Sequence, residues 1–143
     1  MEQQVRVLIA DDQVHTRQGL QALLAAWPEI EVVGAAADGT EAVELVEKCR
    51  PDVALVDIAM PVPALSALDG RPGSGAEGMD GLEAIRLIKF RQPQVRIVVL
   101  TMYAARRAAA LAAGADAFLL KGCPAQDLLD AIESHASHPI GQG

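Results

Sequence analysis

Residues 5–12 have the sequence Val5-Arg-Val-Leu-Ile-Ala-Asp-Asp12, a short β-branched and aliphatic run that two aspartates end. Apolar runs of this length are typical of strands buried on both faces of a parallel sheet. Four further runs of the same kind follow, each bounded by charge, glycine or proline: Glu31–Ala36, Val53–Val56, Val95–Leu100 and Ala117–Leu120. The sequence therefore predicts five short strands.

The segments between these runs carry apolar residues at helical spacing. The predicted helices are His15–Ala26, Thr40–Cys49, Gly81–Arg91, Ala104–Ala113 and Ala125–Ala136. Several prolines and glycines fall at the ends of these elements, which supports the same division of the chain. Strands that alternate with helices imply right-handed crossovers, so we expect an α/β fold with a doubly wound parallel sheet.

Length and composition favour one soluble domain. The chain has 143 residues, about half of them apolar, and a net charge of -7, which argues against direct binding of nucleic acid. Its two cysteines lie far apart and form no metal-binding pair, so a reducing cytoplasm fits best. The sequence shows neither a signal peptide nor a membrane-spanning segment, so secretion and membrane insertion are not expected.

Polar residues follow the predicted strands at the same edge of the sheet, where parallel sheets bind ligands. Asp11 and Asp12 follow the first strand, and Asp57, Thr101 and Lys121 end the third, fourth and fifth strands. Three carboxylates held close together raise one another's pKa and favour a compensating cation. Oxygen ligands without His or Cys suit Mg²⁺, and a Lys and a hydroxyl can bind the oxygens of a phosphoryl group at Asp57.

Each of these residues also has a structural explanation when it is taken alone. An Asp-Asp pair after a strand is usually a turn or a helix cap, and a lone lysine is more often a surface charge. Five such residues at one edge, from four different strands, favour a functional site over these explanations.

Five motifs resemble the receiver domains of two-component response regulators, over residues 5 to about 136. They are Val-Leu-Ile-Ala-Asp11-Asp12, Leu-Val-Asp57-Ile-Ala-Met-Pro61, Gly-Met-Asp-Gly81-Leu-Glu-Ala, Leu-Thr101-Met and Gly114-Ala-Asp-Ala-Phe118-Leu-Leu-Lys121. The opening and ending motifs are most similar to receivers of LuxR/NarL-type transcriptional regulators. The resemblance implies a flavodoxin-like (βα)5 fold with strand order 2-1-3-4-5, a receiver domain over residues 1–136 and a polar tail over residues 137–143.

The resemblance also implies roles for individual residues. Asp57 would be the phosphoacceptor, and Asp12, Asp57 and the backbone carbonyl of Ala59 would be direct ligands of Mg²⁺. Asp11 would act mainly through metal-bound water. Lys121 would pair with a phosphoryl oxygen.

Thr101 would hydrogen-bond another phosphoryl oxygen and let Phe118 change rotamer, which couples the site to the output surface. The phosphodonor would be a sensor histidine kinase. A LuxR-type DNA-binding domain absent from this chain and a homodimer formed on phosphorylation complete the expected partners.

Two departures from the family pattern stand out. About 16 residues, Val62 to Glu77, intervene between Met60-Pro61 and the Gly-Met-Asp-Gly motif, and this segment is rich in glycine and proline. The stretch from Thr101 to Lys121 is about two residues shorter than the family pattern, so the Ala104–Ala113 helix is expected to start late or sit askew.

Three functions remain in competition at this stage. The first is a phosphoaspartate switch that catalyses only its own phosphorylation and dephosphorylation, and the second is an interaction module that works without phosphorylation. The third, a phosphohydrolase, is less favoured because Ala59 stands where a general acid would be needed.

Overall fold

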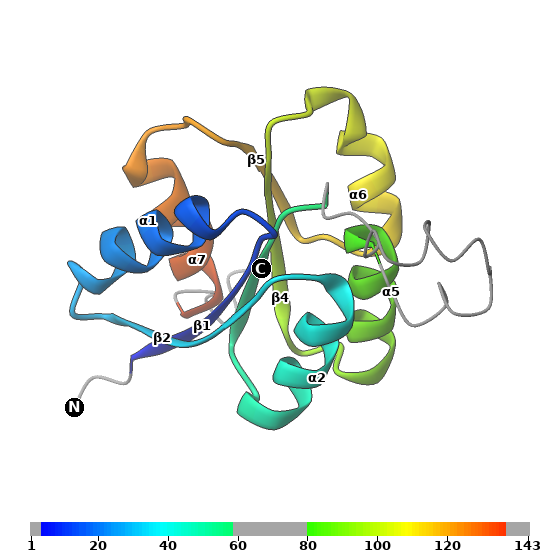
Figure 1. The fold of residues 1–143 in the computed structure, drawn as a ribbon, viewed down its shortest axis with the longest axis horizontal. Helices are drawn as coiled ribbons and strands as arrows, with labels where there is room; N and C mark the ends of the chain where they lie inside the picture. The colour runs from blue at the N-terminus through cyan, green and yellow to red at the C-terminus, as the bar shows by residue number, and fades with distance from the viewer. Residues whose placement is uncertain (1–3, 59–79, 137–143) are drawn as a thin grey trace.

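The computed structural model describes residues 4–58 and 80–136 (Figure 1). The strands of these two ranges are β1 (Val5–Ala10), β2 (Ile30–Ala36), β3 (Val53–Val56), β4 (Arg96–Thr101) and β5 (Ala117–Leu120). They form one parallel sheet in the order β2-β1-β3-β4-β5. The predicted fold class and strand order are therefore confirmed.

The helices lie between the strands along the chain. They are α1 (Val14–Ala25), α2 (Gly39–Cys49), α5 (Gly81–Arg91), α6 (Arg107–Ala113) and α7 (Ala125–Ala136). Figure 1 shows α1 and α7 on one side of the sheet and α5 and α6 on the other. The inner strands β1, β3 and β4 are thus buried on both faces, as their apolar sequences predict, whereas the edge strands β2 and β5 are only partly buried.

The side chains of β1 alternate between two cores, one on each face of the sheet. Leu8 and Ala10 of β1 face a core that includes residues of α2, α5 and α6, whereas Val7 and Ile9 face a core that includes residues of α1 and α7. Side chains point to opposite faces at successive strand positions, so one strand contributes to both cores. The site at the end of β1 therefore rests on a strand that is fixed from both sides.

Two helices on the α2 and α5 side begin at aspartates that cap them. Asp38 accepts a hydrogen bond from the backbone N–H of Glu41 at 2.8 Å, and Asp80 accepts one from Glu83 at 2.9 Å. These side chains satisfy N–H groups that lack a partner within the first helical turn. The cap at Asp80 fixes where α5 starts, close to the end of β3.

The predicted helix over Ala104–Ala113 is partly wrong. Residues Ala104–Arg106 form a 3₁₀ turn, and the α-helix starts only at Arg107, which agrees with the expected late start. No side chain caps this helix, and Arg106 and Arg107 place positive charge at its N-terminus, where the helix dipole disfavours it. The remaining elements differ from the prediction by at most one residue at either end: β4, for example, runs from Arg96 to Thr101 and not from Val95 to Leu100.

Several predictions concern residues outside the described ranges. These are the carbonyl of Ala59, the inserted segment from Val62 to Glu77 and the tail over residues 137–143. Among the helices that the structure describes, none is long and apolar enough to span a bilayer.

Candidate acidic site at the carboxyl ends of the strands

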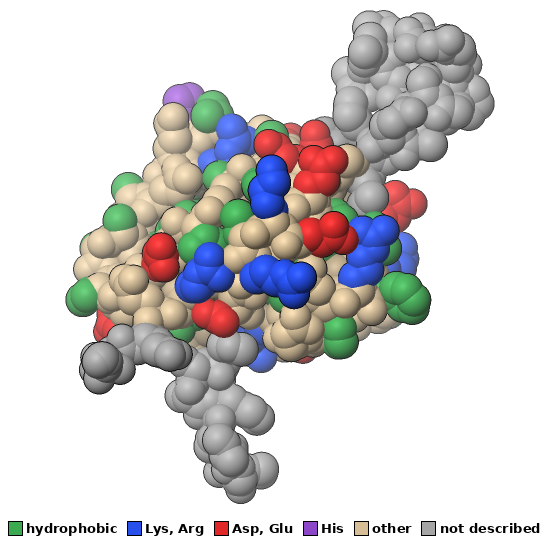
Figure 2. Space-filling model, turned by 90° about the horizontal axis from the view of Figure 1, so that it is seen from below, with side chains coloured by type: hydrophobic (Ala, Val, Ile, Leu, Met, Phe, Trp, Pro, Cys, Tyr) green, Lys and Arg blue, Asp and Glu red, His purple; other side chains and the backbone are tan. Residues whose placement is uncertain are grey.

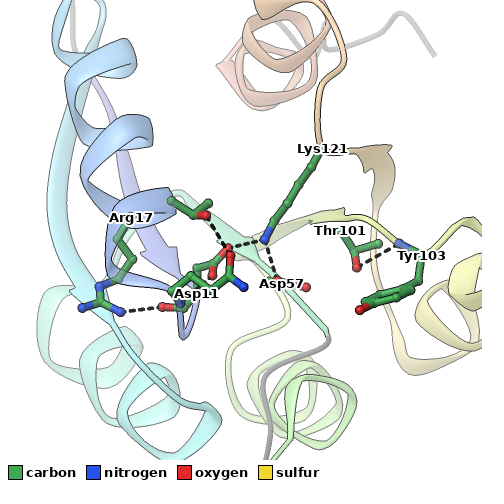
Figure 3. A network of polar contacts seen from close by, with 8 residues as sticks. Asp11, Arg17, Asp57, Thr101, Tyr103 and Lys121 are labelled. Atoms are coloured by element: carbon green, nitrogen blue, oxygen red, sulfur yellow. Dashed lines mark hydrogen bonds and ion pairs between the residues drawn. The ribbon is translucent and has the colours of Figure 1, made fainter.

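The predicted site residues of the described ranges meet at one edge of the sheet (Figure 3). Asp11 and Asp12 follow β1, Asp57 follows β3, Thr101 is the last residue of β4 and Lys121 follows β5. The chain leaves β1 toward α1 on one face, whereas α5 covers the other face beside β3. Such a reversal opens a crevice at the carboxyl ends of the strands, which is where open α/β sheets bind ligands.

Asp11 is buried, at 2 % exposure, and makes four separate interactions with the surrounding protein. Its N–H donates to the carbonyl of Ala36 at 3.0 Å, and its Oδ1 accepts from the N–H of Gln13 at 2.9 Å. Its backbone carbonyl accepts from Nη1 of Arg17 at 2.7 Å, and Oδ2 lies 2.9 Å from Nζ of Lys121. A buried carboxylate needs such partners, because burying an unpaired charge is unfavourable.

Asp57 is also buried, at 5 % exposure, and its backbone lies against the first residue of α5, Gly81. Its N–H donates to the carbonyl of Ala10 at 2.9 Å, which continues the β1–β3 pairing past the strand end. A Cβ atom on Gly81 would lie 2.4 Å from the Cα of Ile58 and 2.8 Å from the carbonyl oxygen of Asp57. The first residue of α5 must therefore be a glycine for the backbone after Asp57 to stay in place.

Lys121 joins the two buried carboxylates. Its Nζ lies 2.8 Å from Oδ2 of Asp57 and 2.9 Å from Oδ2 of Asp11, and its side chain is 16 % exposed. Burial alone would lower the pKa of Lys121, but the hydrogen bonds and charges of Asp57 and Asp11 outweigh it and raise that pKa above 10.5. Lys121 is therefore charged at neutral pH and neutralises part of the acidic cluster.

Asp12 is exposed and completes a group of three carboxylates. One oxygen from each of Asp11, Asp12 and Asp57 lies within 4.8 Å of the others. Burial, followed by the negative charge of Asp11, raises the pKa of Asp12 above its usual 3.8. The cluster has more negative charge than Lys121 alone can balance, so it fits an oxygen-coordinated divalent cation such as Mg²⁺.

Thr101 and Phe118 lie on the side of the site that faces α6. Thr101 is fully buried, and its Oγ1 accepts a long hydrogen bond of 3.4 Å from the N–H of Tyr103. Phe118 is half-buried in β5 and packs against the α5 and α6 core, with the guanidinium carbon of Arg107 5.9 Å from the centre of its ring. The two predicted switch residues belong to neighbouring strands, β4 and β5.

Sequence reasoning missed two residues that shape this site. Nothing in the spacing of Arg17 shows that its guanidinium turns back toward Asp11. For Gly81 the sequence did contain an indication. Glycine is a poor helix former, so its presence at the start of a helix suggests that another backbone approaches closely there. Ala59 lies outside the described residues, so its predicted role as a metal ligand stays a prediction.

A family model described as the response regulator receiver domain matches residues 7–66 and 76–133 of this chain. The transcriptional regulatory protein LiaR of Bacillus subtilis is 38% identical over 132 residues, which cover 91% of this chain and 55% of LiaR. The transcriptional regulatory protein DegU of Brevibacillus brevis is 36% identical over 134 residues, which cover 92% of this chain and 50% of DegU. The chain thus spans about half the length of these curated relatives.

Solved structures give the same likeness. The response regulator domain of Thermotoga maritima CheB superposes with a TM-score of 0.76 at 30% identity, covering 93% of this chain and 96% of that domain. The receiver domain of a putative response regulator NarL from Mycobacterium tuberculosis gives a TM-score of 0.74 at 30% identity, covering 92% of this chain and 98% of that domain. Both likenesses extend over nearly the whole chain.

Proposed function

Because the chain belongs to the response regulator receiver domains of two-component signalling, we propose that Asp57 is its phosphoacceptor and that phosphorylation of Asp57 switches its output surface. The observation that carries this proposal is the position of Lys121, whose ammonium lies between the buried carboxylates of Asp57 and Asp11. A cluster of one lysine and three carboxylates, two of them buried, favours the binding of a cation and a phosphoryl group together.

The transfer itself needs little from the protein besides position and charge. An oxygen of the Asp57 carboxylate attacks phosphorus, the bond from phosphorus to the donor atom breaks, and the electron pair of that bond leaves with the donor. Asp57 is proposed as the reacting group because Lys121 contacts it directly and Thr101 of β4 lies on its side away from Asp11 (Figure 3). In-line transfers of this kind depend on electrostatic stabilisation of the transferring oxygens, and Lys121 supplies a fixed positive charge for them.

The acidic cluster would hold Mg²⁺ in this proposal. Asp12 and Asp57, with the backbone carbonyl of Ala59, would be direct ligands, and Asp11 would act through water. When bound, the ion neutralises charge on the phosphoryl oxygens.

Thr101 would carry the signal from the site to the surface. A phosphoryl group adds about -1.5 to -2 charges and three strong acceptors at Asp57. The long hydrogen bond that the Thr101 hydroxyl accepts from Tyr103 holds it only weakly, so the hydroxyl can shift and donate its O–H to a phosphoryl oxygen. Movement of Thr101 would let Phe118 change its rotamer and alter the surface formed by α6, β5 and α7.

The test is to incubate the protein with Mg²⁺ and acetyl phosphate and to measure its intact mass. Wild type should gain one phosphoryl group and Asp57→Asn none, whereas the control Asp130→Asn, at an exposed aspartate of α7, should gain one as well. A wild type that stays unmodified with acetyl phosphate, phosphoramidate and carbamoyl phosphate alike contradicts the proposal.

A module that binds partners without phosphorylation is the second candidate, and the late start of α6 favours it. It predicts equal partner binding by phosphorylated and unphosphorylated protein. Two nearly buried carboxylates argue for the switch instead, because they destabilise a fold that has no use for them.

The remaining parts of the proposal concern the whole protein. The phosphodonor is a sensor histidine kinase, the protein acts in the cytoplasm, and this chain catalyses only its own phosphorylation and dephosphorylation. We further propose that a LuxR-type DNA-binding domain in a longer protein regulates transcription, as the names of LiaR and DegU suggest, and that phosphorylation promotes a homodimer.

A further inference from the structure

Arg17 contacts the acidic site from the first turn of α1. Its side chain is half-buried, and its Nη1 donates a hydrogen bond of 2.7 Å to the backbone carbonyl of Asp11 (Figure 3). The residue before α1, Gln13, makes no side-chain cap for the helix. Arg17 is therefore a tie between α1 and the loop that leads from β1 into it.

The carbonyl that Arg17 holds belongs to the peptide unit between Asp11 and Asp12. The preceding unit is fixed by the bond from the Asp11 N–H to Ala36, and the following unit by the bond from the Gln13 N–H to Oδ1 of Asp11. The N–H of the middle unit contacts the carboxylate of Asp12 itself, which does not connect it to the rest of the protein. Within the described residues, the hydrogen bond from Arg17 therefore orients this unit, and with it the direction in which Asp12 leaves the backbone.

Asp12 needs such a restraint more than its neighbours do. It is exposed, whereas Asp11 and Asp57 are buried and paired with Lys121. Repulsion from two nearby carboxylates pushes the Asp12 side chain toward solvent, and a loop free to rotate at the Asp11–Asp12 peptide would allow it to move away.

The charge of Arg17 works in the opposite sense, because a nearby positive charge repels a divalent cation. At a half-exposed position this effect is screened by water and salt and changes the cation affinity by only about threefold. Groups that orient metal ligands without touching the metal change affinity by about 10-fold to 100-fold. The orienting effect therefore outweighs the repulsion.

From this geometry we propose that Arg17 is a positioning residue for divalent-cation binding, which acts by fixing the peptide between Asp11 and Asp12. This inference rests on the proposed function, since it assigns Arg17 a part in building the same site. It adds a residue of α1 that touches neither the phosphoryl group nor the cation.

The first experiment measures Mg²⁺ binding to the unphosphorylated protein by titration calorimetry. Arg17→Met should weaken binding about tenfold. In phosphorylation by acetyl phosphate, the half-saturating Mg²⁺ concentration should rise by a similar factor, while the rate at saturating Mg²⁺ stays within about twofold of wild type. A purely structural role would lower the plateau rate instead.

Arg6→Met is the matched control. Nη1 of Arg6 also donates to a backbone carbonyl at 2.7 Å, that of Arg50, but at the opposite edge of the sheet. The Arg6→Met substitution should leave the Mg²⁺ affinity within twofold of wild type. The proposal is overturned if Arg17→Met binds Mg²⁺ within twofold of wild type, or if Arg6→Met weakens binding as much as Arg17→Met does.

A double-mutant cycle tests whether Arg17 acts through Asp12. The cycle uses Mn²⁺, which like Mg²⁺ suits carboxylate, carbonyl and water ligands. In an Asp12→Asn protein, Arg17→Met should change the Mn²⁺ affinity by less than twofold. A tenfold loss in that background overturns the route through Asp12. If wild type binds no divalent cation, the proposed function fails together with this inference, whereas normal binding by both wild type and Arg17→Met removes this inference alone.

Discussion

Lys121 is the residue on which the buried charges of the site depend. Replacing it with Met leaves Asp11 and Asp57 buried without their ammonium partner, so we expect Lys121→Met to lower the free energy of unfolding by about 2–4 kcal/mol at pH 7 in EDTA. Urea unfolding measures this loss. Adding Mg²⁺ should restore part of it, because a cation that binds only the folded protein stabilises that state.

The control for this prediction is Lys48→Met, at an exposed lysine of α2, which should change the unfolding free energy by less than about 0.5 kcal/mol. The raised pKa of Lys121 sets the pH range of the effect. The folded protein binds the proton more tightly than the unfolded chain, so the stabilisation is complete below pH 10.5 and is lost as pH rises through the folded value. Equal stabilities of the two variants at pH 7 would contradict the assigned ion pairs.

Asp12 is predicted to act against stability when no cation is present. Its pKa is raised in the folded protein, so its ionisation at neutral pH disfavours folding, and that penalty is relieved as pH falls through the folded pKa toward 3.8. Asp12→Asn should therefore raise the melting temperature in EDTA at pH 7 by about 1–3 °C, because exposed charges are worth well under about 1 kcal/mol.

The gain from Asp12→Asn should disappear below pH 3.8, where Asp12 is protonated in both states, and should reverse in saturating Mg²⁺, because the variant loses a ligand. Thermal melts at the two pH values, with and without Mg²⁺, provide the measurement. A melting temperature in EDTA that falls on substitution would show that Asp12 is not repelled by Asp11 and Asp57.

At the scale of elements, the contact between α5 and the end of β3 depends on a missing side chain. A Cβ on Gly81 would lie 2.4 Å from the Cα of Ile58, so Gly81→Ala must displace the backbone beside Asp57. We expect it to lower the unfolding free energy by about 1–3 kcal/mol and to slow phosphorylation by acetyl phosphate about tenfold or more.

At Gly19, in contrast to Gly81, an added Cβ should stabilise the protein. It lies inside α1 with no atom within 4 Å of an added Cβ, so Gly19→Ala should raise the unfolding free energy by about 0.5–1 kcal/mol. Denaturant unfolding and phosphorylation rates of both variants test the pair. A Gly81→Ala protein as stable and as fast as wild type would contradict the close approach.

The elements were predictable where local sequence and tertiary packing agree. Gly81–Arg91 and Ala125–Ala136 were placed to the residue, because an apolar stripe and a polar or proline start mark both. The helix before β5 was misplaced because its alanines satisfy helical spacing from residue 104, whereas the missing cap and the basic residues delay its start.

The site was predictable only as a set of strand-end residues. That Asp11 and Asp57 share one ammonium, and that Arg17 turns back onto the loop, depend on side-chain directions that spacing does not encode. Ends of parallel strands meet by topology, but the pairing of charges within that edge is decided by packing in three dimensions.

For the whole molecule, the helices α6 and α7 are anchored unequally to the cores that they cover. The residues of α6 that are fully buried are Ala110 and Ala113, whereas α7 buries Leu128, Leu129 and Ile132. Burying a Leu or Ile side chain stabilises by about 1.5–3 kcal/mol, far more than an Ala methyl does. Of the two helices on the proposed output surface, α6 is therefore the more weakly held.

This difference predicts a gradient of amide hydrogen exchange. Amides of α6 should exchange at least about tenfold faster than those of α7, since local opening exposes less apolar surface at α6. Exchange followed by mass spectrometry on peptides from the two helices measures it. Equal protection of both helices would show that α6 opens only with the whole domain.

The bridge made by Lys121 also has a consequence for the synthesis of the protein. Lys121 and Asp57 are 64 residues apart in the chain, and Lys121 follows β5, an edge strand that pairs with β4 alone. A ribosome makes the acidic half of the site long before its counter-charge, so a nascent chain shorter than about 120 residues carries Asp11 and Asp57 without the ammonium of Lys121. The site is thus completed last, and a chain that ends before Lys121 lacks the positive charge that the proposed phosphoryl transfer needs.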